Sequence, residues 1–344
     1  MTSLAPYTTF GIGGDAKSFV DATTTDELID AVQSADVADE PLLVLSGGSN
    51  VLISDDGFPG QVVHVATRGI EVEHTDDYVK LTVAAGESMD ALVAQAVDNG
   101  WAGLEALSGI PGLVGAAPVQ NIGAYGAEIA TSIAHVNRWD RTNQSQRRID
   151  AVECGFGYRI SQFKALRPGQ VTGRFVVLDV TFWLKPSPLS DPIAYPELAK
   201  GLGVAMGDRV PLTDVRETVL ALRRSKAMVY DKADPDTHGA GSFFTNPLLT
   251  IEDAEQLAPE APRYSVSSGY VKVSAAWLIE HAGFPKGFGT NQAKVSSKHA
   301  LALTNQGGAT ARDVSALARQ IKDGVEARYG ITLYPEPILV GVQL

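Results

Sequence analysis

The chain has 344 residues, of which 44% are hydrophobic and 20% charged, and its formal net charge is −12. This composition is typical of a globular protein, and the length indicates two or three domains. The acidic balance argues against nucleic acid as a partner, because neutralising phosphates requires a basic surface. The single cysteine, Cys154, excludes an internal disulfide and zinc sites built on cysteine pairs, and we expect no metal.

The first residues, MTSLAPYTTF, contain no basic segment followed by an apolar run, so we expect no secretory signal. No stretch approaches about 20 apolar residues, so we expect no membrane partner. A cytoplasmic monomer is the default expectation.

The elements predicted for the first half alternate between helices and strands. Thr24 and Glu27 form a capping box ahead of a helix with Leu28 and Val32 on one face. Ser88 is the predicted N-cap of a second helix, which ends before Gly100. Short apolar runs predict strands over residues 41–45, 61–66 and 79–85.

The second half continues with a long strand, predicted over residues 174–184 by alternating apolar positions. Helices are predicted over residues 212–226, 274–283 and 309–330. Arg223, Arg224 and Lys226 fall near the end of the first of these, where cations complement the helix dipole. Residues 331–342 are predicted to form two short strands around a proline turn.

Two glycine-rich segments differ in their context. GIGGDA, from Gly11, fits a dinucleotide-binding pattern but follows no predicted strand, so we reject a Rossmann site. SGGSN, from Ser46, does follow a strand. There Gly47 and Gly48 permit an anion-binding nest of backbone amides, with Ser49 and Asn50 as further donors. A simple strand-ending turn is the alternative.

Residues 109–126, GIPGLVGAAPVQNIGAYG, combine five glycines with three alanines and two prolines. So many glycines weaken regular structure. A chain accepts that where a flat group lies against its backbone, although tight packing of two elements is an equal alternative.

Three polar side chains lie in distinctive surroundings. Arg159 follows Tyr158, and a guanidinium binds carboxylate or phosphate in bidentate fashion. Glu336 lies between two prolines, which stiffen the turn that carries it. Ser242 lies in HGAGSFFTNP, where two phenylalanines are expected to supply an apolar wall to the site. Ser242 lacks the surroundings of a nucleophile elbow, and in isolation each of these residues also fits an ordinary surface role.

Six segments, YTTFGIGG, SGGSNVLIS, SGIPGLVGAAPVQNIGAYG, GYRISQFK, GAGSFFTNP and YPEP, occur in the order found in UDP-N-acetylenolpyruvoylglucosamine reductases. The chain resembles this family from about Tyr7 onward. The resemblance implies an α+β fold with a two-lobed FAD-binding domain of the vanillyl-alcohol-oxidase (PCMH) type, residues 1–70 and 71–215. A C-terminal α/β substrate-binding domain follows over residues 216–344, its last residues returning to the FAD site.

The resemblance also implies reduction of the enolpyruvyl nucleotide sugar by NADPH through FAD, both reactants using one site in turn. Arg159 then polarises the substrate carboxylate, Glu336 stabilises the enolate, and Ser242 donates the proton. The residues implied to contact FAD are Gly47, Gly48, Ser49, Asn50, Ile110, Pro111, Gly112, Gly115, Ala116, Asn121, Gly123, Ala124 and Tyr125. Those implied to meet the substrate or NADPH are Tyr158, Tyr195, Lys232, Asn246, Tyr264, Lys272 and Lys286. His299 is left out of the site.

Two alternatives remain. One is an FAD enzyme of the same fold that oxidises a 2-hydroxy acid or a sugar lactone, which would not need Arg159, Ser242 and Glu336 together. The other is a flavin-binding protein that has lost catalysis.

Overall fold

The structure is a computed structural model that describes residues 1–166, 169–266 and 269–344. It separates into two compact units. Unit 1 comprises Met1–Thr2, Ala16–Gly47 and Pro59–Ser225, and unit 2 comprises Ser3–Asp15, Gly48–Phe58 and Lys226–Leu344. The division of residues 1–215 into two FAD-binding lobes stays a prediction.

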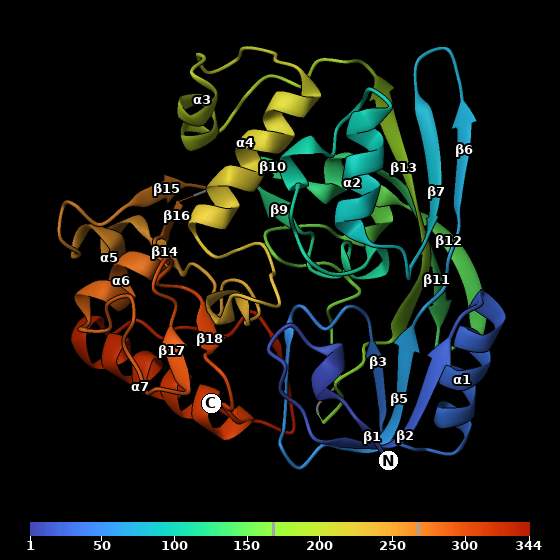
Figure 1. Ribbon diagram of the computed structural model, residues 1–344, viewed down its shortest axis with the longest axis horizontal. Coiled ribbons are helices and arrows are strands. Elements are labelled where there is room, and N and C mark those ends of the chain that lie inside the picture. The colour runs from blue at the N-terminus through green and yellow to red at the C-terminus, as the bar shows by residue number, and fades with distance from the viewer. Residues whose placement is uncertain (167–168, 267–268) are drawn as a thin grey trace. The chain divides into compact units, whose positions relative to one another are not determined.

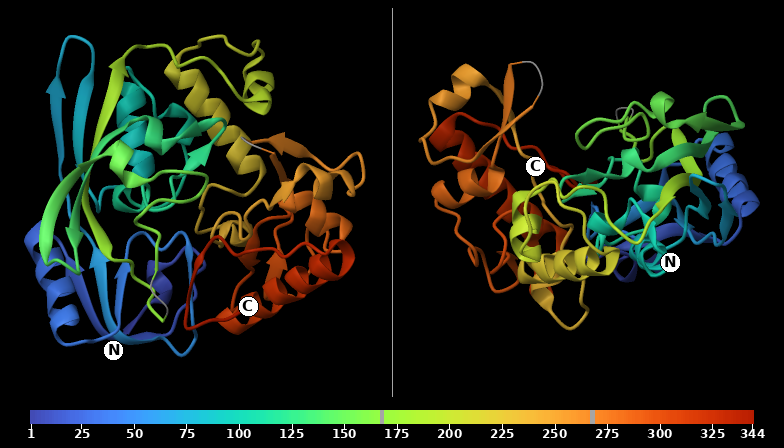
Figure 2. Two further views of the ribbon diagram at one scale, coloured as in Figure 1. Left: turned by 180° about the vertical axis from the view of Figure 1, so that it is seen from behind. Right: turned by 90° about the horizontal axis from the view of Figure 1, so that it is seen from above.

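The first sheet of unit 1 has four strands in the order β1 (Thr2–Ser3), β2 (Asp15–Ala22), β5 (Phe58–Val65) and β3 (Leu42–Leu45). Helix α1 (Thr25–Val37) packs against it through Leu28 and Val32, which are fully buried (Figure 1; Figure 2). The capping box of Thr24 and Glu27 is present, as predicted. The GIGGDA glycines precede strand β2 and open no helix, which confirms that they form no Rossmann loop.

The second sheet of unit 1 is built on the long strand β13 (Phe175–Pro186), and its neighbouring strands are antiparallel. Its main path is β12 (Ser145–Asp150), β11 (Ile133–Asp140), β13, β7 (Val79–Ala84) and β6 (Ile70–His74), and β8 (Trp101–Ala102) also pairs with β13. Helix α2 (Met89–Asp98) shares a core with this sheet. Ser88 caps α2 by accepting a hydrogen bond from the Ala91 amide at 3.3 Å, as predicted.

Two further helices complete unit 1. Helix α3 (Pro196–Leu202) packs against α4 (Leu212–Ser225) through a small cluster that includes Leu198, Val215 and Val219. Between β8 and β11 lies the glycine-rich segment, which contains the two-residue strand β9 (Gly123–Ala124) and is followed directly by its partner β10 (Ala127–Glu128).

Unit 2 has one main core, to which three helices and several short strands contribute. The predicted helices are present as α6 (Ala275–His281) and α7 (Ala311–Tyr329), and Gly330 ends α7 at φ +67°. Helix α5 (Ile251–Glu255) is additional. The strands are β14 (Leu248–Thr250), β16 (Tyr270–Val273) and β15 (Arg263–Ser265) in one sheet, the hairpin of β17 (Ala293–Val295) and β18 (Leu303–Asn305), and the parallel pair of β4 (Val51–Ile53) and β19 (Ile338–Val340).

The prediction of two strands over residues 331–342 is wrong in one part, because only β19 forms. Residues 331–334 instead run beside the segment after Ser242. The Thr245 amide donates to the Tyr334 carbonyl at 3.1 Å, and Phe244 and Pro335 form an isolated bridge. The prolines on either side of Glu336 cannot donate to a ladder, which limits pairing to single bridges.

Candidate active site

The two glycine-rich segments meet within unit 1. A Cβ atom added at Gly47 would lie 2.9 Å from the Gly112 Cα, and one added at Gly115 would lie 2.5 Å from the Ala85 Cβ. Both positions therefore require glycine because another part of the chain approaches closely. The close contact supports the tight-packing alternative, and it also places two predicted FAD-binding segments side by side.

Ser46 is a further candidate at this point, and it is absent from the residues predicted from the sequence. Its hydroxyl oxygen is buried and has no hydrogen-bond partner within the described part of the chain. A buried hydroxyl donor without a protein acceptor fits a ligand with acceptor oxygens, such as the pyrophosphate of FAD. The signal was present in the sequence, since Ser46 opens the SGGSN segment directly after β3.

The remaining nest residues belong to unit 2 and are held by its backbone. Gly48 has φ +58°, and its carbonyl oxygen accepts from the Thr9 amide at 3.1 Å. The Asn50 amide side chain donates to the Glu336 carbonyl oxygen at 3.3 Å, and the Asn50 carbonyl accepts from the Ile338 amide at 3.0 Å. These two bonds connect Asn50, the last predicted donor of the nest, to the turn that carries Glu336.

Arg159 lies beside the glycine-rich segment of unit 1. Its guanidinium donates from Nη1 to the Asn121 carbonyl at 3.3 Å and from Nη2 to the Gly123 carbonyl at 2.8 Å. The guanidinium also lies 5.6 Å from the centre of the Tyr158 ring. Arg159 itself has φ +55°, a conformation that non-glycine residues rarely adopt and that is concentrated at functional sites.

Asn121 was predicted to contact FAD, yet its side chain is engaged inside unit 1. It donates to the Glu128 carboxylate at 2.8 Å and to the Gly157 carbonyl at 3.1 Å, and it accepts from the Ala130 amide at 3.1 Å. Asn121 is 1% exposed and has φ +46°. Its side chain therefore joins three segments around Arg159, and any contact with FAD falls to its neighbours or its backbone.

Ser242 and Glu336 lie on adjacent segments of unit 2. The Glu336 amide donates to the Phe243 carbonyl at 2.9 Å, so the residue next to Ser242 is bonded directly to Glu336. Phe243 and Phe244 are 0% and 1% exposed, with ring centres 5.2 Å apart. The expectation that they form an apolar wall of the site is wrong, because both rings belong to the core and anchor the loop instead.

The predicted substrate residues divide between the units. In unit 1, Tyr195 packs edge-on against Tyr125 at 5.7 Å. In unit 2, Tyr264 and Lys272 are cross-strand partners, with the Lys272 ammonium 5.7 Å from the Tyr264 ring centre. Asn246 accepts from the Ala275 amide at 2.9 Å, and Lys232 and Lys286 are exposed.

The sequence analysis placed Arg223 near a helix end and did not predict that its side chain is buried. Its guanidinium is buried in unit 1, and this burial lowers its pKa, while the interactions with Tyr125 and Asp90 act in the opposite direction. Burial raises the pKa of Tyr125 to about 12, although Arg223 opposes this shift. The grouping of Arg223 with Tyr125 and Asp90 could not be predicted, because these residues are far apart in the sequence and share no periodic pattern.

Asp90 is the acidic member of this group. Both of its carboxylate oxygens accept from Arg216, at 2.7 and 3.1 Å, and one also accepts from the Gly109 amide at 2.6 Å. Burial alone would raise the pKa of Asp90, but the bonds from Arg216 and Gly109 and the nearby positive charges lower it. The start of the glycine-rich segment is thereby tied to α2 and α4.

Residues 1–166, 169–266 and 269–344 are the part of the chain that the structure describes. Over these residues, no group of three or more His, Cys, Asp or Glu side chains is placed to hold a metal ion. No helix in the same ranges has the length and hydropathy needed to cross a bilayer.

Comparison with known proteins identifies both parts of the chain. Residues 16–141 match the family model of an FAD binding domain. Residues 234–340 match the model of the C-terminal domain of UDP-N-acetylenolpyruvoylglucosamine reductase. The α+β class, with an FAD-binding domain followed by a C-terminal domain, is therefore confirmed.

Full-length relatives carry the same name. The chain is 52% identical to the UDP-N-acetylenolpyruvoylglucosamine reductase of Thermobifida fusca, covering 99% of this chain and 97% of the relative. It is 51% identical to that of Cutibacterium acnes, covering 98% and 89%. The crystal structure of the Thermus caldophilus reductase is similar at a TM-score of 0.68 and 26% identity, over 98% of this chain and 97% of that one. The chain therefore belongs to the family of UDP-N-acetylenolpyruvoylglucosamine reductases, which are FAD-dependent oxidoreductases.

Proposed function

We propose that this chain reduces UDP-N-acetylenolpyruvoylglucosamine to UDP-N-acetylmuramate with NADPH, and that Arg159, Ser242 and Glu336 carry the chemistry. The observation that carries the proposal is the full-length match to reductases of this name. Gly47, Gly48, Ser49 and Asn50 would hold FAD, which would supply hydride transfer from NADPH to the terminal carbon of the enolpyruvyl group. The adjacent carbon then carries negative charge shared with its carboxylate, and the chain must stabilise and protonate it.

Arg159 is proposed to polarise the substrate carboxylate. Its bonds to the Asn121 and Gly123 carbonyls fix the plane of the guanidinium before any substrate arrives. A cation held in advance stabilises developing charge without reorganising during the reaction. The same two bonds place it beside the segment proposed to lie along FAD.

Glu336 is proposed as the second stabiliser of the enolate. Two like charges disfavour joint ionisation, so a carboxyl group beside a substrate carboxylate has to be protonated or paired with a cation. The backbone of Glu336 is bonded on two sides, to Phe243 and to the Asn50 side chain. These bonds support a fixed position for its carboxyl group.

Ser242 is proposed to donate the proton to the carbon next to the carboxylate. A hydroxyl group is a weak acid, but the enolate is basic and the donor is held in place. Gly241 precedes Ser242 at φ +65°, and the Phe243 amide donates to the Leu301 carbonyl at 2.7 Å. Ser242 therefore lies between two fixed backbone positions.

The nucleotide-sugar and NADPH contacts are proposed for seven side chains at the rim. They are Tyr158, Tyr195, Lys232, Asn246, Tyr264, Lys272 and Lys286. Three lysines near a dianionic diphosphate would offset the net charge of −12 locally. Cytoplasmic location and a monomeric state are part of the same proposal, since cytoplasm supplies NADPH and nucleotide sugars. Light scattering of the purified protein measures the monomeric state.

The proposal is tested with the visible spectrum of the purified protein under anaerobic conditions. The expected result is a flavin band that bleaches with NADPH and returns when the UDP-linked enolpyruvyl sugar is added. A band that bleaches but does not return would point to another acceptor, such as the product of a 2-hydroxy acid or sugar-lactone oxidation. Absence of any flavin band after addition of FAD would overturn the proposal.

A further inference from the structure

The loop that carries Ser242 is attached to one neighbouring turn at three points. We define the Ser242 loop as residues 234–245 and the serine turn as residues 296–302, which connect β17 to β18. Both belong to unit 2. The first attachment is the side chain of Asp236, and the second is the backbone of Phe243. The third is a partly exposed ion pair between Asp234 and Lys298.

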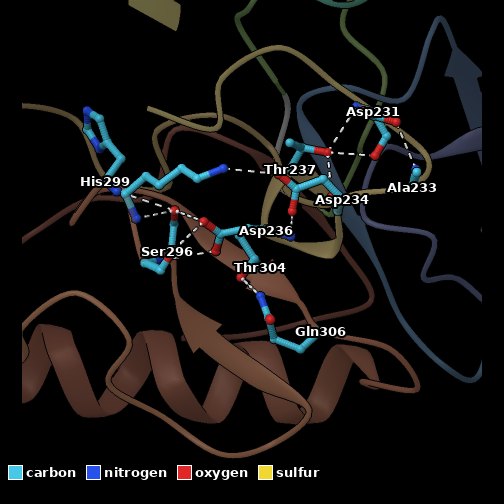
Figure 3. Close-up of polar contacts among 11 residues, drawn as sticks. Asp231, Ala233, Asp234, Asp236, Thr237, Ser296, His299, Thr304 and Gln306 are labelled. Carbon is cyan, nitrogen blue, oxygen red and sulfur yellow. Dashed lines mark hydrogen bonds and ion pairs between the residues drawn. The ribbon is translucent and has the colours of Figure 1, made fainter. Parts of the chain in front are cut away.

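At the first point, three donors of the serine turn converge on the Asp236 carboxylate (Figure 3). Oδ2 accepts from the hydroxyl groups of Ser296 at 3.0 Å and Ser297 at 2.9 Å, and Oδ1 accepts from the Ser297 amide at 3.0 Å. Asp236 is 9% exposed and Ser296 is fully buried. A buried carboxylate bonded in this way is held rigidly.

Hydrogen bonds within the serine turn connect Ser296 to the far end of the turn. The Ser296 hydroxyl accepts from the amides of Lys298 at 3.1 Å and His299 at 3.3 Å. His299 in turn accepts the Leu301 amide at Nδ1, at 3.0 Å. The Leu301 carbonyl then receives the Phe243 amide at 2.7 Å, one residue after Ser242.

The middle of the Ser242 loop lies along β18. The Asn305 amide donates to the His238 carbonyl at 2.8 Å, and Gly239 forms an isolated antiparallel bridge with Thr304. The Gly239 carbonyl also accepts the Thr9 hydroxyl at 2.6 Å. Asp236 therefore attaches the loop to the serine turn through a buried carboxylate, whereas the ion pair of Asp234 with Lys298 is partly exposed.

We infer that Asp236 is a positioning residue, which holds the Ser242 loop against the serine turn so that the Ser242 hydroxyl can reach the carbon it protonates. The inference rests on the proposed function. It extends that function to a carboxylate and two serines, Ser296 and Ser297, that do not themselves touch substrate.

The carboxylate is required because of the number and kind of its partners. Two acceptor oxygens serve three donors, and the Ser296 hydroxyl already accepts from two amides. An asparagine at position 236 would keep the volume but offer one carbonyl oxygen, and its NH₂ group would face hydroxyl donors. The loop would then lose its buried attachment at this end while Phe243 and Phe244 stay in the core.

The test separates the two half-reactions of the holoenzyme by anaerobic stopped-flow absorbance. Reduction by NADPH needs no proton from Ser242, whereas reoxidation by the enolpyruvyl sugar does. In Asp236→Asn we expect reoxidation to slow by about 10- to 100-fold, because small displacements of a catalytic group have effects of this size, while reduction stays within about twofold. The solvent deuterium isotope effect on reoxidation should rise, because proton transfer limits that step more strongly.

A double variant shows whether Asp236 acts through Ser242. If it does, Asp236→Asn should not slow reoxidation further in a Ser242→Ala background. The inference would be overturned if the two substitutions slowed reoxidation multiplicatively in the double variant. It would also be overturned if Asp236→Asn alone slowed both half-reactions equally. Ser297→Ala removes one of the three donors and should give a smaller loss of the same kind, which provides a result if Asp236→Asn does not fold.

The matched control is Asp234→Asn in the same loop. Asp234 accepts the Asp236 amide at 3.0 Å, as asparagine also can, and forms a partly exposed ion pair with Lys298 at 3.1 Å. We expect both half-reactions of Asp234→Asn to proceed at wild-type rates.

If the wild-type protein is not reoxidised by the sugar, the proposed function fails. If the wild type is reoxidised and Asp236→Asn matches it, only this inference fails.

Discussion

The guanidinium of Arg159 is bonded to the carbonyl oxygen of Gly123 at 2.8 Å, and this bond links a residue proposed for catalysis to the glycine-rich segment proposed for FAD. A Cβ atom at Gly123 would lie 2.7 Å from the Ala127 carbonyl oxygen and 3.3 Å from the Arg159 Nη1, so a side chain there would clash with the backbone and crowd the guanidinium. The glycine therefore serves both the close approach of the chain and the position of the cation.

Replacement of Arg159 by alanine should lower kcat/KM by at least about 100-fold, because a preorganised charge is lost where charge develops. Arg159→Lys keeps the charge but cannot bond both carbonyls, and it should recover only part of the rate. Steady-state kinetics with NADPH and the enolpyruvyl sugar measures both. Arg147→Ala, which breaks an exposed ion pair with Glu153, is the control and should behave as wild type. Equal losses in Arg159→Ala and Arg147→Ala would remove Arg159 from the mechanism.

Ser242→Ala should bind FAD normally and lower kcat by about 100- to 10,000-fold, the usual contribution of a general acid. The flavin spectrum before and after NADPH should match wild type, because the hydroxyl group is not needed for that step. A Ser242→Ala protein with full turnover would show that another group or water donates the proton.

Asn121→Ala should lower the free energy of unfolding by about 3 kcal/mol, because buried partners lose their bonds and alanine disfavours φ +46°. Asn121→Gly loses the same bonds but accepts this φ, so it should be more stable than Asn121→Ala by about 1 kcal/mol. Urea unfolding of the two variants and the wild type gives both differences. A glycine variant no more stable than the alanine variant would mean that the backbone conformation relaxes.

Stability should fall in acid partly through Asp140. The hydrogen bond from Arg174 is the largest cause that lowers the pKa of Asp140 to about 2, with further bonds from the Thr142 and Asn143 amides. Because the folded pKa is depressed, the stabilisation is present above the unfolded pKa of about 3.9 and disappears as pH falls through about 2. Arg174 is partly exposed, so we expect about 1–2 kcal/mol at pH 7.

The matched variant for this prediction is Asp140→Asn, which cannot ionise. The difference in unfolding free energy between wild type and Asp140→Asn should shrink from pH 7 to pH 3, measured by urea denaturation at each pH. If the difference in unfolding free energy between the two proteins did not depend on pH, ionisation of the Asp140 carboxyl group would not contribute to stability.

Local signals predicted helices α1, α2, α4, α6 and α7 and strands β3, β5, β7, β13 and β19, whereas α3, α5 and the other strands were not predicted. The caps at Thr24, Ser88 and Gly330 act over three or four residues, so their sequence is enough to place a helix end. The expected strand at residues 331–334 was wrong, because a strand needs a partner and the prolines beside Glu336 limit pairing.

Long-range relationships could not be found in this way. Residues 3–15 and 48–58 belong to the same unit as the last 119 residues, Lys226–Leu344, and no periodic pattern encodes such an association. The same limit applies at the candidate site. The sequence pointed to Arg159, Ser242 and Glu336 through their motifs, whereas Ser46, Arg223 and Asp236 draw their importance from burial and partners that only the folded chain supplies.

The parallel pairing of β4 with β19 has a consequence for the order of folding during synthesis. Strand β4 ends at Ile53, and its partner begins at Ile338, so β4 leaves the ribosome long before its partner exists. Such distant contacts slow folding and leave a strand edge exposed in the meantime. Unit 2 therefore closes late, and the segment that closes it also carries Glu336, so a nascent chain has no complete set of proposed catalytic residues until nearly all of it has been made.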